Sequence, residues 1–242
     1  MGTAHKRKSR AELARQVRRL RPGQQAKLPL AERPGHGGKR RNAGRKSASG
    51  RSPVARVRRP LLRANHPVHV NWRVHPQVWS MRTWRCFRVM LRGFAASADR
   101  FGMRITHFSV MQNHVHLIVE ADGTAALSRG MQGLAIRLAK GLNKLMGRKG
   151  EVFADRFHAH PLETPTETRN AIDYVMNNAR IHAQRNGKPG PRGSDEYAVS
   201  HTQLRDRTAL WRRLGSGPPV VEPRGFMLTE GWMLARVQRK VA

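Results

Sequence analysis

Apolar and polar positions follow regular periods from residue 66 onward, and these periods predict four strands and three helices. Alternation with period two places Val68, Val70 and Trp72 on one face of the first strand. Apolar residues spaced three and four apart, such as Leu134, Leu138 and Leu142, indicate amphipathic helices. The predicted strands are 66–74, 103–110, 114–120 and 152–160, and the predicted helices are 80–100, 125–146 and 164–183.

The order of these elements indicates the fold class. Strand, helix, strand, strand, helix, strand is the order of the ferredoxin-like split βαβ arrangement. We therefore expect an α+β fold, an antiparallel sheet with helices on one face, plus an extra C-terminal helix. That helix should begin at the capping box Thr164-Pro165-Thr166-Glu167, with Pro165 at its first position. The arrangement alone does not give a function.

The chain divides into three segments by composition. Residues 1–63 are rich in Gly, Pro, Ser and Arg and hold 20 Lys and Arg against 2 Glu. Such a segment cannot bury enough apolar surface to fold, so we expect a disordered basic arm, which either orders on nucleic acid or stays a solvated tail without a specific role. A folded domain is expected over 64–185. A loop and accessory tail follow over 186–242, with apolar pieces near 210–211 and 226–237.

The charge and the cysteine content indicate the partner and the compartment. The net charge is +32 and the isoelectric point is about 12.0, which favours a polyanionic partner, most simply nucleic acid. No run approaches 18 apolar residues, so we expect no spanning helix and no membrane partner. The start of the chain lacks a signal-peptide pattern. The single cysteine, Cys86, cannot form an internal disulfide and fits a reducing cytoplasm.

The strand expected over 114–120 carries half of a metal site. His114 and His116 flank Val115, so both imidazoles project from one face while Val115 can pack on the other. The capped helix supplies Tyr174 and Asn178, which are four residues apart and therefore neighbours on one helical face. Two imidazoles and one amide oxygen leave open positions on a divalent ion for water or phosphate. Attack by the Tyr174 hydroxyl on a phosphate would then give a covalent phosphotyrosine, which suits strand transfer better than hydrolysis.

The remaining histidines and several cations are less informative. His107 lies on the neighbouring strand and could face either side. His158 and His160 form a second His-x-His, either exposed on the strand, in contact with DNA or in an alternative metal site. The other three histidines of this region are expected in surface or turn positions: His66, His69 and His75. The candidate DNA-binding cations are Arg156, Arg137, Lys140 and Lys144.

Two motifs give the sequence a family resemblance. The segment Met111-Gln112-Asn113-His114-Val115-His116-Leu117 resembles the Met-Pro-Asn-His-x-His-Leu motif of single-tyrosine HUH transposases, especially the REP-associated tyrosine transposases of bacteria. The segment Tyr174-Val175-Met176-Asn177-Asn178-Ala179 resembles their Tyr-Ile-x-x-Asn-Pro motif. The similarity spans about residues 66–184 and includes Phe153-Ala154-Asp155-Arg156-Phe157. Gln112 and Ala179 replace prolines, and neither change removes a chemical group.

The resemblance implies an activity and a set of partners. It implies a cytoplasmic, nucleoid-associated bacterial transposase that cleaves and rejoins single-stranded DNA near hairpin or palindromic repeats, through a 5′-phosphotyrosine. Tyr174 would be the nucleophile, and His114, His116 and Asn178 would bind Mg²⁺ or Mn²⁺. The resemblance also implies a homodimer, although a monomer remains open.

Three alternatives remain. A histidine-triad nucleotide hydrolase would need a third alternating histidine where this chain has Ile118. A replication or mobilisation HUH nuclease often carries a second nearby tyrosine, whereas Tyr197 follows Tyr174 by 23 residues, past a Gly/Pro loop. A catalytically retired, transposase-derived DNA-binding regulator is the third, although all four chemical groups are present.

Overall fold

The computed structural model of the chain describes residues 61–190, 193–203, 211 and 215–235. All of them belong to the compact unit Ser52–Ala242. The arm expected over residues 1–63 lies outside the described part except for its last three residues.

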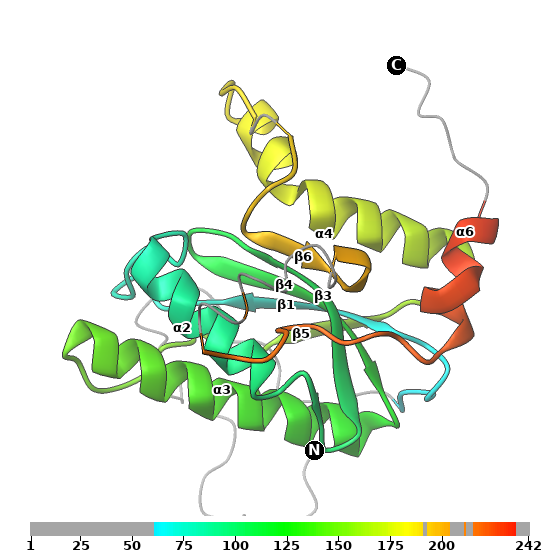
Figure 1. Ribbon diagram of the computed structural model, residues 1–242, viewed down its shortest axis with the longest axis horizontal. Helices are drawn as coiled ribbons and strands as arrows, with labels where there is room; N and C mark the ends of the chain where they lie inside the picture. The colour runs from blue at the N-terminus through cyan, green and yellow to red at the C-terminus, as the bar shows by residue number, and fades with distance from the viewer. Residues whose placement is uncertain (1–60, 191–192, 204–210, 212–214, 236–242) are drawn as a thin grey trace, which may run out of the picture. The chain divides into compact units, whose positions relative to one another are not determined.

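An antiparallel sheet forms the centre of this unit (Figure 1). Its strands are β1 (Val68–Arg73), β2 (Asp99–Arg100), β3 (Met103–Val110), β4 (His114–Ala121), β5 (His158–Pro161) and β6 (Ala198–Ser200). The strand order is β2-β3-β4-β1-β5, and β6 pairs with β3. The four strands β3-β4-β1-β5, with helices after β1 and β4, give the ferredoxin-like arrangement, so the predicted fold class is confirmed.

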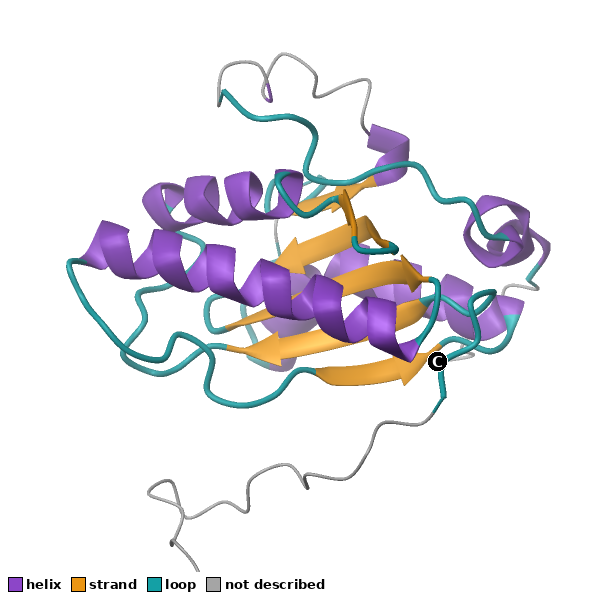
Figure 2. Cartoon of the chain, turned by 90° about the horizontal axis from the view of Figure 1, so that it is seen from below, coloured by secondary structure: helices purple, strands orange, loops and turns teal. Residues whose placement is uncertain are grey.

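Helices cover both faces of the sheet. The described helices are α2 (Trp84–Ala95), α3 (Thr124–Met146), α4 (Pro165–Arg185) and α6 (Trp232–Leu234), with a 3₁₀ turn η1 (His201–Gln203) and a π-helical turn η2 (Met227–Gly231). Figures 1 and 2 show α2 and α3 side by side on one face, with α4 on the other. None of these helices is both long enough and apolar enough to cross a membrane.

The face beneath α2 and α3 holds the larger hydrophobic core. Val115, Leu117 and Val119 of β4 project into it, as the period-two pattern predicts, together with Val68 and Val70 of β1. The facing helices supply buried residues at spacings of three and four: Phe87, Met90, Leu91, Phe94, Leu127, Met131, Leu134, Leu138 and Leu142. Helix α3 ends where Gly147 adopts a left-handed conformation with φ 61°, so its end agrees with the predicted helix 125–146.

Helix α4 begins at the predicted capping box. The Thr164 hydroxyl accepts a hydrogen bond from the Glu167 backbone N–H at 3.1 Å, and the Glu167 carboxylate accepts one from the Thr164 N–H at 3.2 Å. Ile172 and Val175 of α4 then pack in a second, smaller core with Ile118 of β4. This packing places the helix that carries Tyr174 over the face of β4 from which His114 and His116 project.

The fourth predicted strand is only partly correct. A strand was expected over 152–160, but β5 covers His158–Pro161. One isolated bridge, between Val74 and Phe153, and side-chain contacts hold the segment before β5. The Phe153 ring stacks on Trp72 at 3.6 Å between centroids, and the Trp72 indole donates to the Asp155 carbonyl at 3.1 Å. The apolar residues that indicated a strand are therefore packing residues of a loop.

The region after residue 185 packs on the same sheet. β6 pairs with β3 through Val199, which is fully buried, and Trp211 and Val220 join the larger core. Leu228 of η2 joins the smaller core beside α4. The expected apolar pieces at 210–211 and 226–237 thus supply core residues where the structure describes them.

Candidate active site

The two histidines of the motif lie at the start of β4, opposite polar residues of β1. The antiparallel register pairs His114 with Arg73 and His116 with Asn71. Directly paired residues share a face of the sheet, so all four project toward the side that α4 covers. The hydrophobic residues between them hold the strands against the larger core.

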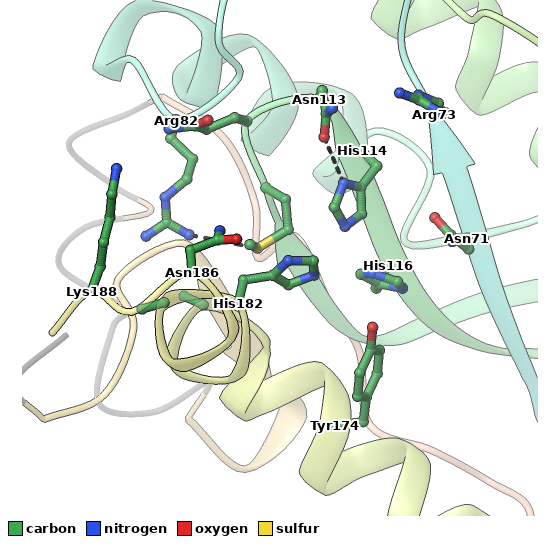
Figure 3. A pocket seen from close by; sticks show the side chains of 14 residues that line it. Asn71, Arg73, Arg82, Asn113, His114, His116, Tyr174, His182, Asn186 and Lys188 are labelled. Atoms are coloured by element: carbon green, nitrogen blue, oxygen red, sulfur yellow. Dashed lines mark hydrogen bonds between the residues drawn. The ribbon is translucent and has the colours of Figure 1, made fainter. Parts of the chain in front are cut away.

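A pocket of about 740 Å³ opens beside these residues (Figure 3). Strand β1, the loop before β4, strand β4 and helix α4 all contribute to it. Its lining residues are Asn71, Arg73, Arg82, Met111, Gln112, Asn113, His114, His116, Tyr174, Ala179, His182, Ala183, Asn186 and Lys188. His114, His116 and Tyr174, which the sequence predicts to act together, therefore meet in one cavity.

Hydrogen bonds anchor the same nitrogen of both imidazoles. His114 Nδ1 lies 2.8 Å from Asn113 Oδ1, and because that oxygen only accepts, His114 Nδ1 carries the proton. His116 Nδ1 lies 3.1 Å from His69 Nε2. The rings of His114 and His116 are nearly perpendicular, with centroids 4.9 Å apart. Both Nε2 atoms thus remain for other partners.

Burial keeps both histidines neutral. Removal from water is the largest cause, and together with nearby His182 and Arg73 it lowers the pKa of His114 to about 4. Burial lowers the pKa of His116 to about 3, with contributions from His69, His114 and His182. Both side chains are therefore neutral at pH 7, and the neutral imidazole is the form that binds a metal ion.

Tyr174 lies within contact distance of the histidine pair. Its ring is 5.3 Å from that of His116 and 6.0 Å from that of His69, edge-on in both cases. Figure 3 shows its hydroxyl pointing from α4 toward His116. The arrangement presents a hydroxyl and two neutral imidazoles to the same space.

Asn178 lies one turn beyond Tyr174 on α4. It is fully buried, and among the described residues neither polar atom of its amide has a hydrogen-bond partner. It does not belong to the pocket lining. His116 Nε2 is likewise buried and lacks a partner within the described part of the chain. Buried polar groups without partners are costly, so a ligand bound by these atoms would relieve that cost.

By their chemistry the three predicted ligands fit a divalent ion, and the pocket lining includes two of them, His114 and His116. Two neutral imidazole nitrogens and an amide oxygen suit Mg²⁺ or Mn²⁺ with open positions. The described residues contain no group of three or more His, Cys, Asp or Glu placed to hold a metal ion. The expected set has only two such residues, with an amide as its third ligand.

Two histidines of this site carry no motif in the sequence. His69 was expected in a surface or turn position; this is wrong, because it is partly buried on β1 and contacts His116. His182 projects from α4 toward His114, with ring centroids 5.5 Å apart. A signal for each existed: His69 alternates with Val68 and Val70, and His182 lies two turns beyond Tyr174. Neither signal identifies a site residue unless it is known how the strands pair and where α4 lies on them.

The cations of the pocket also differ from those that the sequence singled out. Arg73, Arg82 and Lys188 line the pocket. Of these, Arg82 forms an ion pair with Asp195 at 2.6 Å. Arg156 is exposed on the loop before β5. Arg137, Lys140 and Lys144 lie on α3, on the opposite face of the sheet from α4, and are not brought to the pocket.

Three further histidines, His107, His158 and His160, do not line the pocket, although His158 and His160 are paired across the strands with Asn71 and His69. His158 and His160 are exposed on β5. His107 is buried on β3, 3.0 Å from the Thr106 hydroxyl.

Comparison with known proteins gives a match to one family model. Residues 65–178 match the family model described as "Transposase IS200 like", which spans every strand from β1 to β5 and ends at Asn178. Over these residues the chain is similar to this family of transposases.

Two solved structures are similar to the chain. One is a REP-associated tyrosine transposase bound to a REP hairpin, with 13% identity, TM-score 0.48, and coverage of 71% of this chain and 93% of that one. The other is assigned as a transposase from Deinococcus radiodurans, with 11% identity, TM-score 0.34, and coverage of 58% and 100%. No curated protein shows a significant match.

Proposed function

We propose that the protein cleaves and rejoins single-stranded DNA, with Tyr174 as the nucleophile. The observation that carries this proposal is the meeting of Tyr174, His114 and His116 in one pocket of a transposase domain. The Tyr174 oxygen attacks the scissile phosphorus, and the bond to the 3′ oxygen breaks. The products are a 5′-phosphotyrosine and a free 3′ hydroxyl, which takes up a proton as the phenol loses one to solvent.

We assign metal binding and binding of the DNA backbone to other residues at the site. His114 Nε2, His116 Nε2 and the Asn178 amide oxygen would hold Mg²⁺ or Mn²⁺, in keeping with the metal dependence general to these transposases. When bound, such an ion neutralises phosphate charge and aligns the reacting oxygens. Arg73 and Lys188 line the same pocket and would bind the DNA backbone on either side of the reacting phosphate.

The proposal extends to strand transfer and to the class of DNA that the protein acts on. Each strand exchange conserves one phosphodiester bond, so the covalent intermediate can pass to a new 3′ hydroxyl. The resemblance to REP-associated transposases extends the proposal to hairpin or palindromic repeats near the gene. A homodimer is part of the same proposal.

The proposal is tested by trapping the intermediate with DNA labelled at one end. Incubate the full chain and Mn²⁺ with single-stranded oligonucleotides covering the DNA on either side of its gene. A 5′-phosphotyrosine retains the fragment that carries a 3′ label, so only 3′-labelled DNA should give a labelled, denaturation-resistant adduct. An adduct that carries the 5′ label would contradict the polarity.

The chain contains a matched control for the nucleophile. Tyr174→Phe should abolish the adduct, because only the hydroxyl is removed. Tyr197 is the only other tyrosine; its ring packs on Phe87 at 4.6 Å, outside the pocket. Tyr197→Phe should form the adduct normally. If Tyr174→Phe still forms it, the assignment is wrong, and DNA binding without any adduct would favour the retired regulator.

A further inference from the structure

His69 contacts both halves of the site although neither motif contains it. Its Nε2 lies 3.1 Å from His116 Nδ1, and the two rings stack at 5.2 Å with an interplanar angle of 27°. Its ring also lies edge-on to Tyr174 at 6.0 Å. His69 is fixed in this place by its strand, because its neighbours Val68 and Val70 are fully buried on the other face of β1.

The hydrogen bond between the two rings can run in either direction, and the two directions leave His116 Nε2 in different states. This nitrogen is buried without a partner among the described residues, so either state leaves it unsatisfied, at a cost of about 1–3 kcal/mol, but only a lone pair there can be satisfied by a metal ion. With the proton on Nδ1, the N–H donates to His69 Nε2. The lone pair of His116 Nε2 then remains available, which is what a metal ion requires.

His114 shows the same arrangement with a different partner. Its Nδ1–H donates to Asn113 Oδ1, which leaves its own Nε2 available. Both imidazoles are therefore anchored through Nδ1, one by an amide and the other by a histidine. A partner on the second nitrogen is how metal-binding histidines are oriented, and its loss typically costs 10–100-fold in metal affinity.

We propose that His69 is a positioning residue: by accepting a hydrogen bond from His116 Nδ1–H, it holds His116 in the tautomer and orientation that present Nε2 to a divalent ion. This inference rests on the proposed function, because it assigns a role toward the metal of that site. It predicts that His116 carries its proton on Nδ1 before any metal or DNA is added.

The tautomer can be measured directly in the metal-free full chain. Two-bond ¹⁵N–¹H correlation spectra of the imidazoles distinguish a protonated Nδ1 from a protonated Nε2. We expect His116 to be protonated on Nδ1 in the wild type. A His116 protonated on Nε2 would overturn the proposal without any variant.

Variants of His69 separate the hydrogen bond from packing. His69→Leu removes the acceptor, so it should lose the Nδ1–H tautomer and weaken Mn²⁺ binding, measured by calorimetry without DNA, by 10–100-fold. His69→Gln keeps an acceptor oxygen and should retain most of the affinity. The control is Gln132→Leu, at an exposed position of α3 on the opposite face of the sheet, which should change neither readout.

Each outcome of these measurements decides for or against the proposed role of His69. Unchanged tautomer and affinity in His69→Leu would overturn the proposal, and so would an equal loss in His69→Gln and His69→Leu. Because the tautomer requires no cleavage, its result is independent of the Tyr174→Phe experiment. Failure of the adduct assay with the expected tautomer would count against the proposed function and leave the His69–His116 hydrogen bond standing.

Discussion

Asn178 has an amide that is buried without partners among the described residues, so the proposed metal binding and the stability of the metal-free protein favour different residues at this position. The side chain is fully buried and both of its polar atoms are unpaired within the described part of the chain. Asn178→Leu has a similar volume and removes the unpaired groups, so the metal-free protein should become more stable by about 1–3 kcal/mol. Mn²⁺ affinity should fall in the same variant. Denaturant unfolding and calorimetry measure the two effects.

The adjacent asparagine provides the control for that prediction. The Asn177 amide donates to the Asp173 carbonyl at 2.9 Å and accepts from Arg180. Asn177→Leu should therefore bring no gain in stability and leave Mn²⁺ binding unchanged. If Asn178→Leu instead destabilises the metal-free protein, the amide has a partner in solution and is not held ready for a ligand.

His107 gives the stability of the protein a pH dependence that is separate from the site. Burial lowers its pKa to about 3, with a contribution from His201, against about 6.5 when unfolded. Between these values the unfolded chain binds a proton that the folded chain does not, so stability falls as the pH falls from 6.5 toward 3. Between pH 7 and pH 5 this group should cost about 2 kcal/mol of unfolding free energy.

The contribution of His107 can be separated from that of the other buried histidines by substitution. His107→Asn should lose less stability than the wild type when the pH is lowered from 7 to 5, as measured by urea unfolding at each pH. Exposed His160→Asn should follow the wild type. Identical pH profiles for His107→Asn and the wild type would show that His107 is not desolvated in solution.

At the scale of the elements, α4 depends on the cap that places Tyr174. Thr164→Ala removes the hydroxyl that accepts from the Glu167 N–H, so the free energy of unfolding should fall by about 1 kcal/mol. Thr166→Ala, in the same turn but not at the cap, should have a smaller effect. Urea unfolding measures both, and an equal loss in the two variants would mean that the cap does not form.

The elements also show where sequence patterns stop being informative. Period and capping placed β3, α3 and the start of α4 almost to the residue, because each signal is local. They failed at residues 152–157, where one bridge between Val74 and Phe153 stands in place of the expected strand and the Phe153 ring packs on Trp72. They also missed β6, a three-residue strand that exists only because β3 offers an edge. The candidate site divides in the same way: His114, His116 and Tyr174 carry a motif, whereas His69 joins them only through strand pairing.

At the scale of the whole molecule, one ion pair ties the C-terminal region to the pocket. Asp195, 4% exposed at its side chain, binds both terminal nitrogens of Arg82, at 2.6 and 2.9 Å. Asp195→Ala leaves a partly buried guanidinium unpaired and should destabilise the domain by about 2–4 kcal/mol. The matched control is Asp99→Ala, whose pair with Arg224 is exposed and should be worth less than about 1 kcal/mol. Equal effects of the two variants on the urea midpoint would show that Asp195 does not hold this region in place.

The charge of the chain predicts how binding responds to salt. Residues 1–60 hold 19 Lys and Arg against 2 Glu, and each phosphate neutralised contributes about −0.7 to the slope of log K against log salt on single strands. Removing residues 1–60 should therefore flatten that slope, measured by fluorescence anisotropy with single-stranded DNA at several KCl concentrations. The deletion should stop before Leu62, because its N–H donates to the Thr124 hydroxyl at 2.8 Å, where α3 begins. Replacing Lys39, Arg40, Arg41, Arg45 and Lys46 by Gln should flatten the slope in part, which separates charge from length. An unchanged slope in both proteins would mean that the arm binds no phosphate and that the folded domain accounts for the affinity.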